Sequence, residues 1–442
     1  MNSRSTIYAV SSGSGRAGIA VIRVSGTLAS LAIIRLVGVL PNPRAASLRV
    51  LRSSVDQSVV DEALVLWFPG PKTATGEDLA EFHIHGSTAV VAKLFTELNL
   101  IENVVPAEPG EFTRRAFENG ILDLVEVEGL ADLLGAETES QRRLAMRQFL
   151  GEASSVFEAW RGQLLNAMAF ADAAIDFVEE QDVVDSATLQ ILPILEKLKS
   201  DLEDAVAQSA RAGSVRDGLR LVIAGAPNVG KSTLLNWLAG RDAAIVSPQA
   251  GTTRDVIEAV ISFEGIRLVL ADTAGLRLES SDEIEKIGML RATTETRDAD
   301  ILVWVSAPDI KNEVGPTRVP DLIIMNKSDL FAKDSIHLRN EKQIDISLKV
   351  GAGLSQLKTA LAKLVIERSA LSQDAVVVRD RHLRAVEKTI RKLNDILQRD
   401  NLPLEVMAEE LRDACRIMSS ITGRVDVEDL LGKIFLEFCI GK

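Results

Sequence analysis

The sequence has few cysteines, no long apolar run and no excess of positive charge, and each shortage excludes a class of protein. Cys415 and Cys439 are too few for a disulfide framework or a four-thiolate zinc site. No apolar stretch approaches the roughly 18 residues that span a bilayer, and the N-terminus lacks the order of a signal peptide. The net charge of −13 excludes a protein that coats nucleic acid by bulk positive charge. We therefore expect a soluble, cytoplasmic protein with no membrane partner.

The character of the sequence changes along the chain, which predicts separate domains; its length alone suggests about three. Residues 1–120 mix β-type runs with helical stretches, and residues 121–217 are rich in Ala, Leu and Glu at helical spacing. Residues 218–370 alternate buried-type strands with helices, which is typical of a parallel sheet with crossover helices. Residues 371–442 are helical again. The expected fold class is therefore multidomain α/β and α: an α+β N-terminal domain, and a discontinuous helical domain with an α/β domain inserted in it.

Individual elements follow from the same patterns. The expected strands are Thr6–Val10, Ile19–Val24, Glu62–Phe68, Leu79–Ile84, Leu219–Ala224, Arg267–Ala271, Asp300–Val305 and Asp321–Met325. The expected helices between residues 121 and 217 are Leu124–Gly135, Arg142–Ser154, Ser155–Phe177 and Ser186–Gln208.

The run GAPNVGKS at residues 225–232 matches the phosphate-binding P-loop, with a β-type run before it and a helix-type run after it. Its glycines allow backbone N–H groups to surround phosphates, Lys231 neutralises the β- and γ-oxygens, and the Ser232 hydroxyl ligates Mg²⁺. The nucleotide contacts expected here are Asn228, Val229, Gly230, Lys231, Ser232 and Thr233.

Further motifs follow in a fixed order. Asp272-Thr273-Ala274-Gly275 ends an apolar strand, where the carboxylate holds Mg²⁺ through water and the glycine amide meets the γ-phosphate. Asn326-Lys327-Ser328-Asp329 follows another strand, and its Asp accepts two N–H bonds from guanine, whereas adenine presents an unmatched pattern. Ser347 belongs to a further base-contacting loop. The run Gly251-Thr252-Thr253-Arg254-Asp255, between the first two motifs, supplies a switch threonine for Mg²⁺. The ordered set predicts a GTPase of the translation-factor-like class.

Two details narrow the mechanism. Leu276 stands where Ras-like enzymes place the Gln that orients the attacking water, so the water must be positioned from elsewhere. The acidic stretch 279–285 offers candidates, or is a solvated loop. Asn228 and the loop 247–252 offer oxygen ligands for a monovalent cation in place of an arginine finger. The alternative is a simple P-loop hydrogen bond from Asn228.

Other features leave alternatives open. Gly13–Gly18 matches a dinucleotide fingerprint, but a strand-type run follows where a helix is required, so we expect a hairpin. Glu81, His83 and His85 share one face of a strand, either as a metal triad or, as we favour, as a polar pocket wall. Arg23 is a capped edge residue or an anion contact.

The C-terminal part carries two more such features. Four basic residues, Arg381, Arg384, Lys388 and Arg391, form a stripe on a helix that is a solvated face or an RNA phosphate contact. The FCIGK ending, with Cys439 and Lys442, is a frayed end or a functional tail.

These runs together resemble the MnmE (also called TrmE) family, the bacterial and organellar GTPases of tRNA wobble-uridine modification. The resemblance covers essentially the whole chain. It rests on TIYAVSSGSGRAGIAVIRVSG, TGEDLAEFHIHGS, PGEFTRRAFENGILDLVEVEGLADLL, AGAPNVGKSTLLNWLAGRDAAIVSPQAGTTRD, DTAGLR and DLLGKIFLEFCIGK.

The resemblance implies a folate-binding and dimerising α+β domain and an inserted Ras-like GTPase domain, activated by K⁺ and by G-domain dimerisation. It implies a homodimer that forms a heterotetramer with MnmG, an FAD protein. Together they add an aminomethyl or carboxymethylaminomethyl group to the 5-position of wobble uridine in tRNA. The one-carbon donor is a tetrahydrofolate derivative.

Family roles carry over residue by residue. Arg23, Glu81 and Lys442 match folate contacts, while Ile121 stands where the family normally has a folate-contacting lysine. The expected K⁺ site is Asn228, Ser247, Gln249 and Thr252, and the expected Mg²⁺ ligands are Ser232 and Thr253. The expected catalytic residues are Lys231, Cys439 and Glu285, the last when one extra residue is allowed after Leu276-Arg277.

A second function class is a ribosome-assembly GTPase, an RNA-binding switch without covalent chemistry. That class usually appends a KH domain, whose GXXG loop joins two helices. The comparable run here, Gly15–Gly18, lies between strand-type runs.

Overall fold

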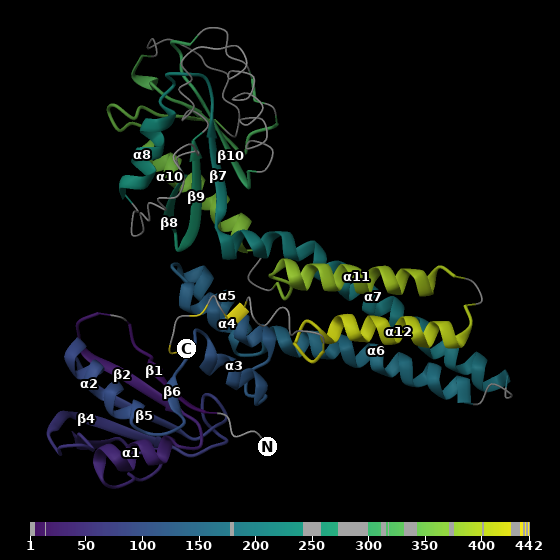
Figure 1. The fold of residues 1–442 in the computed structure, drawn as a ribbon. Coiled ribbons are helices and arrows are strands. Elements are labelled where there is room, and N and C mark those ends of the chain that lie inside the picture. The colour runs from purple at the N-terminus through teal and green to yellow at the C-terminus, as the bar shows by residue number, and fades with distance from the viewer. Residues whose placement is uncertain are drawn as a thin grey trace, which may run out of the picture. The chain divides into compact units, whose positions relative to one another are not determined.

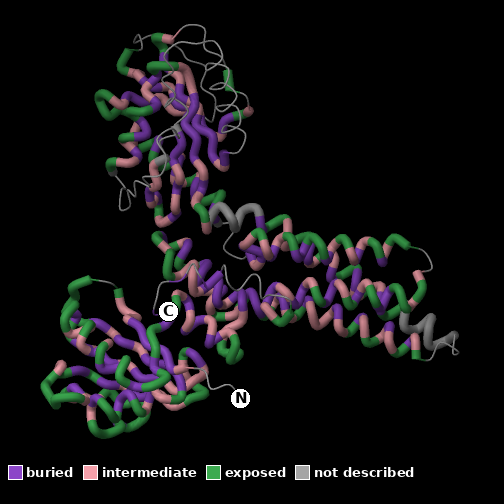
Figure 2. Tube along the Cα trace, in the orientation of Figure 1, coloured by how far each residue is buried: buried purple, intermediate pink, exposed green. Residues whose placement is uncertain are grey.

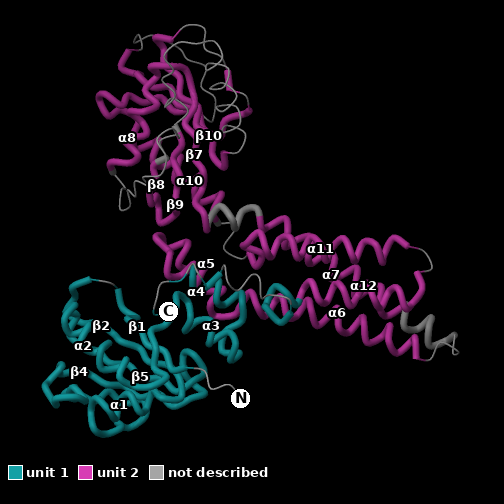
Figure 3. The backbone as a smooth tube through the Cα atoms, in the orientation of Figure 1, with its two compact units in different colours: residues 1–131, 419–442 teal, residues 132–418 magenta. Residues whose placement is uncertain are grey.

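The computed structural model describes residues 5–13, 15–176, 181–241, 258–272, 299–310, 315–316, 318–330, 343–370, 375–399, 402–425, 434–435, 438 and 441. The chain divides into two compact units (Figure 3). The first contains residues 1–131 and 419–442, and the second contains residues 132–418. Within the described ranges, no helix is both long and apolar enough to cross a membrane.

The first unit is built on a six-stranded sheet with the order β3-β4-β5-β2-β1-β6 (Figure 1). Its strands are β1 (Thr6–Val10), β2 (Ala17–Ser25), β3 (Ser47–Arg52), β4 (Val59–Phe68), β5 (Leu79–Gly86) and β6 (Val104–Pro106). Paired strands are antiparallel except for β1 and β6. β1 and β2 pair directly, with Gly13 and Gly15 between them and Gly18 inside β2. A hairpin is therefore observed, as expected, in place of the strand–helix unit of a dinucleotide site.

Helices cover both faces of this sheet. Helices α1 (Ala29–Val37) and α2 (Thr88–Asn99) pack on one face, where Tyr8, Ile22 and Phe82 are buried. Burial is greatest in β1 and β5 and low in the edge strand β3 (Figure 2). On the opposite face, α3 (Glu111–Glu118) contributes a buried Phe112, and α4 (Leu124–Gly135) follows.

The last residues of the chain belong to the first unit. Ile434, Phe435 and Phe438 form a buried cluster with Leu124 and Val127 of α4. Ser11 Oγ donates a hydrogen bond to the carbonyl oxygen of Gly441 at 2.8 Å. Gly441 lies so close to the Val10 backbone that a Cβ there would overlap it, so only glycine fits. The C-terminal residues are therefore held at the end of β1.

The second unit contains a helical part and a second sheet. Its long helices are α5 (Glu139–Phe149), α6 (Glu152–Asp176), α7 (Gln181–Asp217), α11 (Asp380–Leu397) and α12 (Leu404–Ser419). Phe157 of α6 meets His382 of α11 edge to face, with ring centroids 5.3 Å apart. Lys392 of α11 bridges Glu410 and Asp413 of α12 at 2.6 and 3.2 Å.

The second sheet has the order β12-β11-β10-β7-β9-β8 and is parallel except for the edge strand β8. Its strands are β7 (Leu219–Ala224), β8 (Glu258–Phe263), β9 (Ile266–Asp272), β10 (Ile301–Ser306), β11 (Leu322–Met325) and β12 (Gln343–Asp345). The helices among the described residues of this part are α8 (Lys231–Arg241), α10 (Leu354–Ala370) and the short η1 (Ser328–Leu330). The inserted, mostly parallel α/β domain is confirmed.

Helix α5 connects the helical part to this sheet. The Ser140 backbone N–H and hydroxyl both donate to the Gly265 carbonyl, at 3.2 and 3.1 Å. Gln141 Nε2 donates to the Arg216 carbonyl at the end of α7, at 2.8 Å. These bonds fix α5 to the turn between β8 and β9.

Every expected strand lies within or overlaps an observed strand, and Thr6–Val10, Leu219–Ala224 and the helix Leu124–Gly135 have the expected bounds. The expected single helix Arg142–Ser154 is wrong, because the helix ends at Phe149 and a new helix, α6, begins at Glu152. Gly151 adopts a φ of +80°, a left-handed conformation that ends a helix. Its N–H bonds the Gln148 carbonyl at 3.0 Å, which closes the last turn of α5.

Candidate functional site

The P-loop lies between β7 and α8, and its shape depends on two close backbone approaches. Gly225 has a φ of +145°, and a Cβ there would overlap the Val305 carbonyl oxygen. Gly230 has a φ of +101°, and a Cβ there would overlap Asn326 Nδ2. Both positions therefore require glycine. Asn228 also has a positive φ, +64°, and its side chain is exposed.

Lys231 spans the loop from the first turn of α8. Its Nζ donates to the carbonyls of Gly225 and Ala226, at 2.9 and 2.8 Å, and the residue is 6% exposed. The N-terminal N–H groups of α8 lack intrahelical partners and carry partial positive charge. An ammonium group and a helix N-terminus at one loop fit a polyphosphate. Ser232 and Thr233 are exposed on the same turn, so the Ser232 hydroxyl is an accessible oxygen of the kind Mg²⁺ prefers.

Asn326 connects the P-loop to the loop after β12. Its Nδ2 donates to the Val229 carbonyl at 2.8 Å, and its Oδ1 accepts from the Leu348 N–H at 3.2 Å. The residue is 4% exposed. Asn326 therefore acts as a brace that sets the distance between the phosphate end and the base end of the site.

Asp329 is held as an exposed carboxylate at the base end. Ser347, itself fully buried, donates its hydroxyl to Asp329 Oδ1 at 2.6 Å. That bond lowers the pKa of Asp329, so the side chain is an acceptor at neutral pH. Lys327 has a φ of +58°, and its Nζ donates to Asp309 at 2.6 Å. The structure thus brings Lys327, Asp329 and Ser347 to one place, as the motifs predict.

Asp272 is the last residue of β9 and pairs in register with Ile223 of β7, just before the P-loop. The carboxyl ends of β7 and β9 therefore meet where a nucleotide binds in open α/β sheets. The remaining predicted residues, Ser247, Gln249, Thr252, Thr253, Thr273, Ala274, Gly275 and Glu285, lie outside the described residues.

In the first unit, Arg23 and Glu81 form a half-buried ion pair across β2 and β5. Arg23 Nη2 and Nε both contact Glu81 Oε1, at 2.8 and 3.1 Å. His83 Nε2 lies 3.3 Å from the other oxygen of Glu81, and His85 pairs with Asp61 at 2.8 Å. Among the described residues, no three histidine, cysteine, aspartate or glutamate side chains form a cluster that could hold a metal ion. Arg23 is thus paired with a carboxylate across the strand, and Glu81 bridges Arg23 and His83.

Ile121 is 40% exposed and lies beside Gly76. Arg114 and Arg115 are nearby in the chain and could supply the positive charge that Ile121 lacks. Arg115 is 4% exposed and bonds Glu77 and Glu111, at 3.1 and 2.7 Å. Arg114 lies over the Phe435 ring, 5.4 Å from its centroid. Because Arg115 is buried and already paired with two carboxylates, it is a poor substitute for a lysine at position 121.

A cavity of about 890 Å³ lies at the end of β1 in the first unit. It is mostly apolar and is lined by Tyr8, Ala9, Val10, Ser11, Ser12, Gly13, Gly15, Ala20, Gly86, Thr88, Val91, Ala92, Phe95, Pro106 and Ala107. Ser11 also bonds Gly441, so the C-terminal tail reaches the cavity wall. Ala9 pairs with Arg23, which pairs with Glu81, so the ion pair lies on the same sheet face as Ala9. The sequence did not indicate this cavity, because its walls come together only in the fold.

Cys439 and Lys442 lie outside the described residues.

The chain matches two family profiles, "GTP-binding protein TrmE N-terminus" over residues 6–121 and "MnmE helical domain" over residues 124–439. A tRNA modification GTPase MnmE of Beijerinckia indica is 45% identical over 439 residues, covering 99% of this chain and 96% of the relative. The proteins of that name from Brucella anthropi and Rhizobium johnstonii are 44% and 45% identical. They cover 99% of this chain and 98% and 99% of their own lengths. Two adjoining profiles and near-complete coverage leave one conclusion: the chain belongs to the MnmE family.

Proposed function

We propose that the chain is a GTP-hydrolysing enzyme that works in tRNA modification. GTP binding is supported by the arrangement of the site, in which Asn326 holds the phosphate end and the base end together. Lys231 faces the phosphate end, Asp329 is held ionised at the base end, and Asn326 joins the two. The tRNA part rests on family membership, since the relatives named above are tRNA modification GTPases.

In finer detail, we propose that the chain acts with an MnmG-like FAD protein in a heterotetramer. The reaction would add an aminomethyl or carboxymethylaminomethyl group to the 5-position of wobble uridine. The test is a nucleoside digest of tRNA from a deletion strain, complemented with the native chain or with Lys231→Ala. The native chain should restore the modified nucleoside and Lys231→Ala should not. An unchanged digest in the deletion strain would favour the ribosome-assembly alternative.

Potassium dependence is the first prediction about hydrolysis. Asn228 is exposed at the P-loop and offers an amide oxygen, which suits K⁺ together with the predicted Ser247, Gln249 and Thr252. We expect hydrolysis at least roughly tenfold faster in KCl than in NaCl at equal ionic strength, a difference of about 1.4 kcal/mol in barrier.

Asn228→Gly should bring that rate ratio close to one. Glycine is the suitable substitute because it keeps the φ of +64° without strain, whereas alanine would add backbone strain. Steady-state phosphate release, measured at several protein concentrations, also reports the proposed G-domain dimerisation. Equal native rates in the two salts would contradict the potassium site.

For folate, we propose that a tetrahydrofolate derivative occupies the cavity at the end of β1. Its volume and apolar walls suit a pterin with its aromatic linker. Arg23 and Glu81 lie outside the cavity lining and would orient polar edges from the adjoining sheet face. The tail on either side of Gly441 would bring Cys439 and Lys442 to the same cavity. The folate supplies the one-carbon unit when bound. We further propose that the first unit mediates a homodimer.

The second prediction concerns Ile121. Because this apolar residue replaces a cation, Ile121→Lys should tighten binding of 5-formyl-tetrahydrofolate severalfold, as measured by calorimetry. Ile121→Met is the uncharged control and should leave the affinity unchanged. Arg23→Ala should abolish binding. If Ile121→Lys has no effect, another cation already supplies the charge; if no variant binds folate, the flavoprotein partner must deliver the one-carbon unit.

A further inference from the structure

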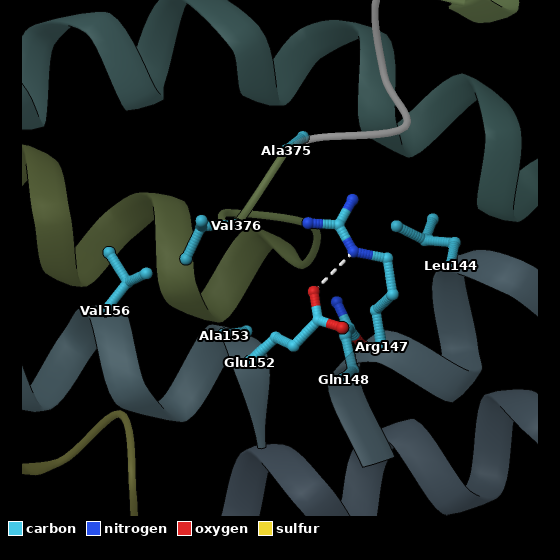
Figure 4. A pocket seen from close by; sticks show the side chains of 8 residues that line it. All are labelled: Leu144, Arg147, Gln148, Glu152, Ala153, Val156, Ala375 and Val376. Atoms are coloured by element: carbon cyan, nitrogen blue, oxygen red, sulfur yellow. Dashed lines mark hydrogen bonds and ion pairs between the residues drawn. The ribbon is translucent and has the colours of Figure 1, made fainter. Parts of the chain in front are cut away.

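A small pocket opens in the second unit where α5, α6 and the segment before α11 meet (Figure 4). Leu144, Arg147 and Gln148 come from α5, and Glu152, Ala153 and Val156 come from α6. Ala375 and Val376, which precede α11, complete the wall. The pocket encloses about 130 Å³. That is below the roughly 300–1,000 Å³ of sites that enclose a whole drug-sized ligand, so it suits a single ring.

Gln148 is the unusual residue of this pocket. It is 2% exposed, yet neither its amide nitrogen nor its amide oxygen has a hydrogen-bond partner among the placed residues. Figure 4 shows the amide on the pocket wall beside the Arg147–Glu152 ion pair, which measures 2.7 Å. Buried amides are normally bonded, and an unmade bond is costly. The amide at the wall of this pocket therefore has a donor and an acceptor without partners, and the side chain must turn toward the opening for both to meet a ligand.

A nucleobase matches this arrangement. A base edge offers a donor next to an acceptor, which a glutamine amide can pair in two hydrogen bonds. Leu144, Ala153, Val156 and Ala375 provide apolar contact for the faces of the ring. Proteins that read RNA loops also stack unpaired bases on arginine, and the Arg147 guanidinium lies at this pocket.

The neighbouring helix favours RNA over a peptide side chain. The chain enters α11 four residues after Val376. Arg384, Lys388 and Arg391 are exposed on α11 at positions i, i+4 and i+7, and no ion pair to an acidic residue is found for them within the described ranges. Many other arginines and lysines of this unit are paired with carboxylates. A stripe of exposed cations on the helix that follows the pocket wall in the chain suits a sugar–phosphate chain.

We propose that the Gln148 pocket binds one unstacked base of the tRNA, while Arg384, Lys388 and Arg391 contact the adjoining phosphates. This inference rests on the proposed function only in taking tRNA as the RNA. Ala375 and Val376, which form one wall of the pocket, lie in the chain between α10 of the inserted domain and α11, so base binding could be coupled to that domain through the chain. By linkage, the nucleotide state and tRNA affinity would influence each other.

The test compares tRNA binding by full-length variants, using fluorescence anisotropy with an unmodified tRNA transcript. Gln148→Leu removes the amide, and Ala153→Leu fills the pocket but keeps Gln148. Each should weaken binding roughly tenfold, the size expected for two lost hydrogen bonds. Gln208→Leu, at an exposed glutamine of α7, is the matched control and should bind normally. GTP hydrolysis without tRNA should stay unchanged in all three, and Gln148→Leu should not lower the melting temperature, because it removes a buried amide that has no partner.

Salt dependence separates the base contact from the phosphate contacts. The double variant Arg384→Gln/Lys388→Gln should lower the slope of log Kd against log salt concentration by about 1.4, at roughly 0.7 per contact to a single strand. Gln148→Leu should leave that slope unchanged. A transcript carrying 2-aminopurine at successive anticodon-loop positions should brighten at one position with the native chain and not with Gln148→Leu.

The outcomes are distinct. If the native chain binds no tRNA, the proposed function fails. If it binds and both pocket variants bind equally well, the pocket holds water only and this inference alone is overturned. If the pocket variants lose affinity for the flavoprotein partner and keep their affinity for tRNA, the pocket is a protein contact and the RNA assignment is wrong.

Discussion

Asp329→Asn should move the nucleotide preference of this protein from guanine to xanthine. In the proposed site the Asp329 carboxylate would accept from both N–H groups of the guanine edge, and the 2.6 Å bond from Ser347 lowers its pKa. An asparagine presents a donor where guanine also presents a donor, while xanthine presents an oxygen there. Losing two charge-assisted bonds costs about 3–6 kcal/mol, so GTP affinity should fall roughly 10²- to 10⁴-fold. Xanthosine triphosphate should bind the variant more tightly than GTP does.

Asp309→Asn is the matched control for this experiment. It makes the same chemical change on a neighbouring carboxylate that bonds Lys327 Nζ at 2.6 Å. Its effect on GTP affinity should be less than about tenfold, with no gain for xanthosine triphosphate, because an ion pair this exposed contributes little. Competition binding of the two nucleotides by both variants gives the answer. An Asp329→Asn chain with native GTP affinity would show that another residue selects the base.

Glu285→Ala should slow GTP hydrolysis by roughly 10²-fold or more while GTP affinity stays nearly native. Leu276 follows the DTAG motif and has no group that can orient water, so we propose that a carboxylate of the acidic stretch orients it. A residue that acts only on the attacking water contributes in the transition state and not in the bound ground state. Single-turnover hydrolysis with saturating protein, together with equilibrium GTP binding, separates the two effects.

Glu283→Ala tests the register of that assignment. The family alignment reaches Glu285 by allowing one extra residue after Leu276-Arg277. If Glu283→Ala causes the loss and Glu285→Ala does not, the catalytic carboxylate is Glu283. If neither variant is slow, the acidic stretch is a solvated segment and the water is positioned by another part of the site.

The nucleotide site was largely predictable because each of its parts is a short contiguous run. The positions of Lys231, Asp272 and Asp329 follow from motifs that stand at the ends of apolar strands. Parallel strands place their carboxyl ends along one edge of a sheet, so motifs far apart in the chain meet there. The order of motifs and the strand periodicity thus determined the fold of the inserted domain and the class of nucleotide.

Other properties depended on contacts between distant residues, which no local pattern encodes. The left-handed turn at Gly151 separates α5 from α6, although the helical periodicity runs through it. Asn326 is motif-like in sequence, but only the fold shows that it braces Val229 against Leu348. The bond from Ser11 to Gly441 joins the two ends of the chain.

The sequence by itself determined which chemistry each motif supports, since that follows from local residue types and spacing. Tertiary structure decided which surfaces enclose a cavity and which buried amide, such as Gln148, is left without a partner, because burial and pairing are set by the whole packed chain.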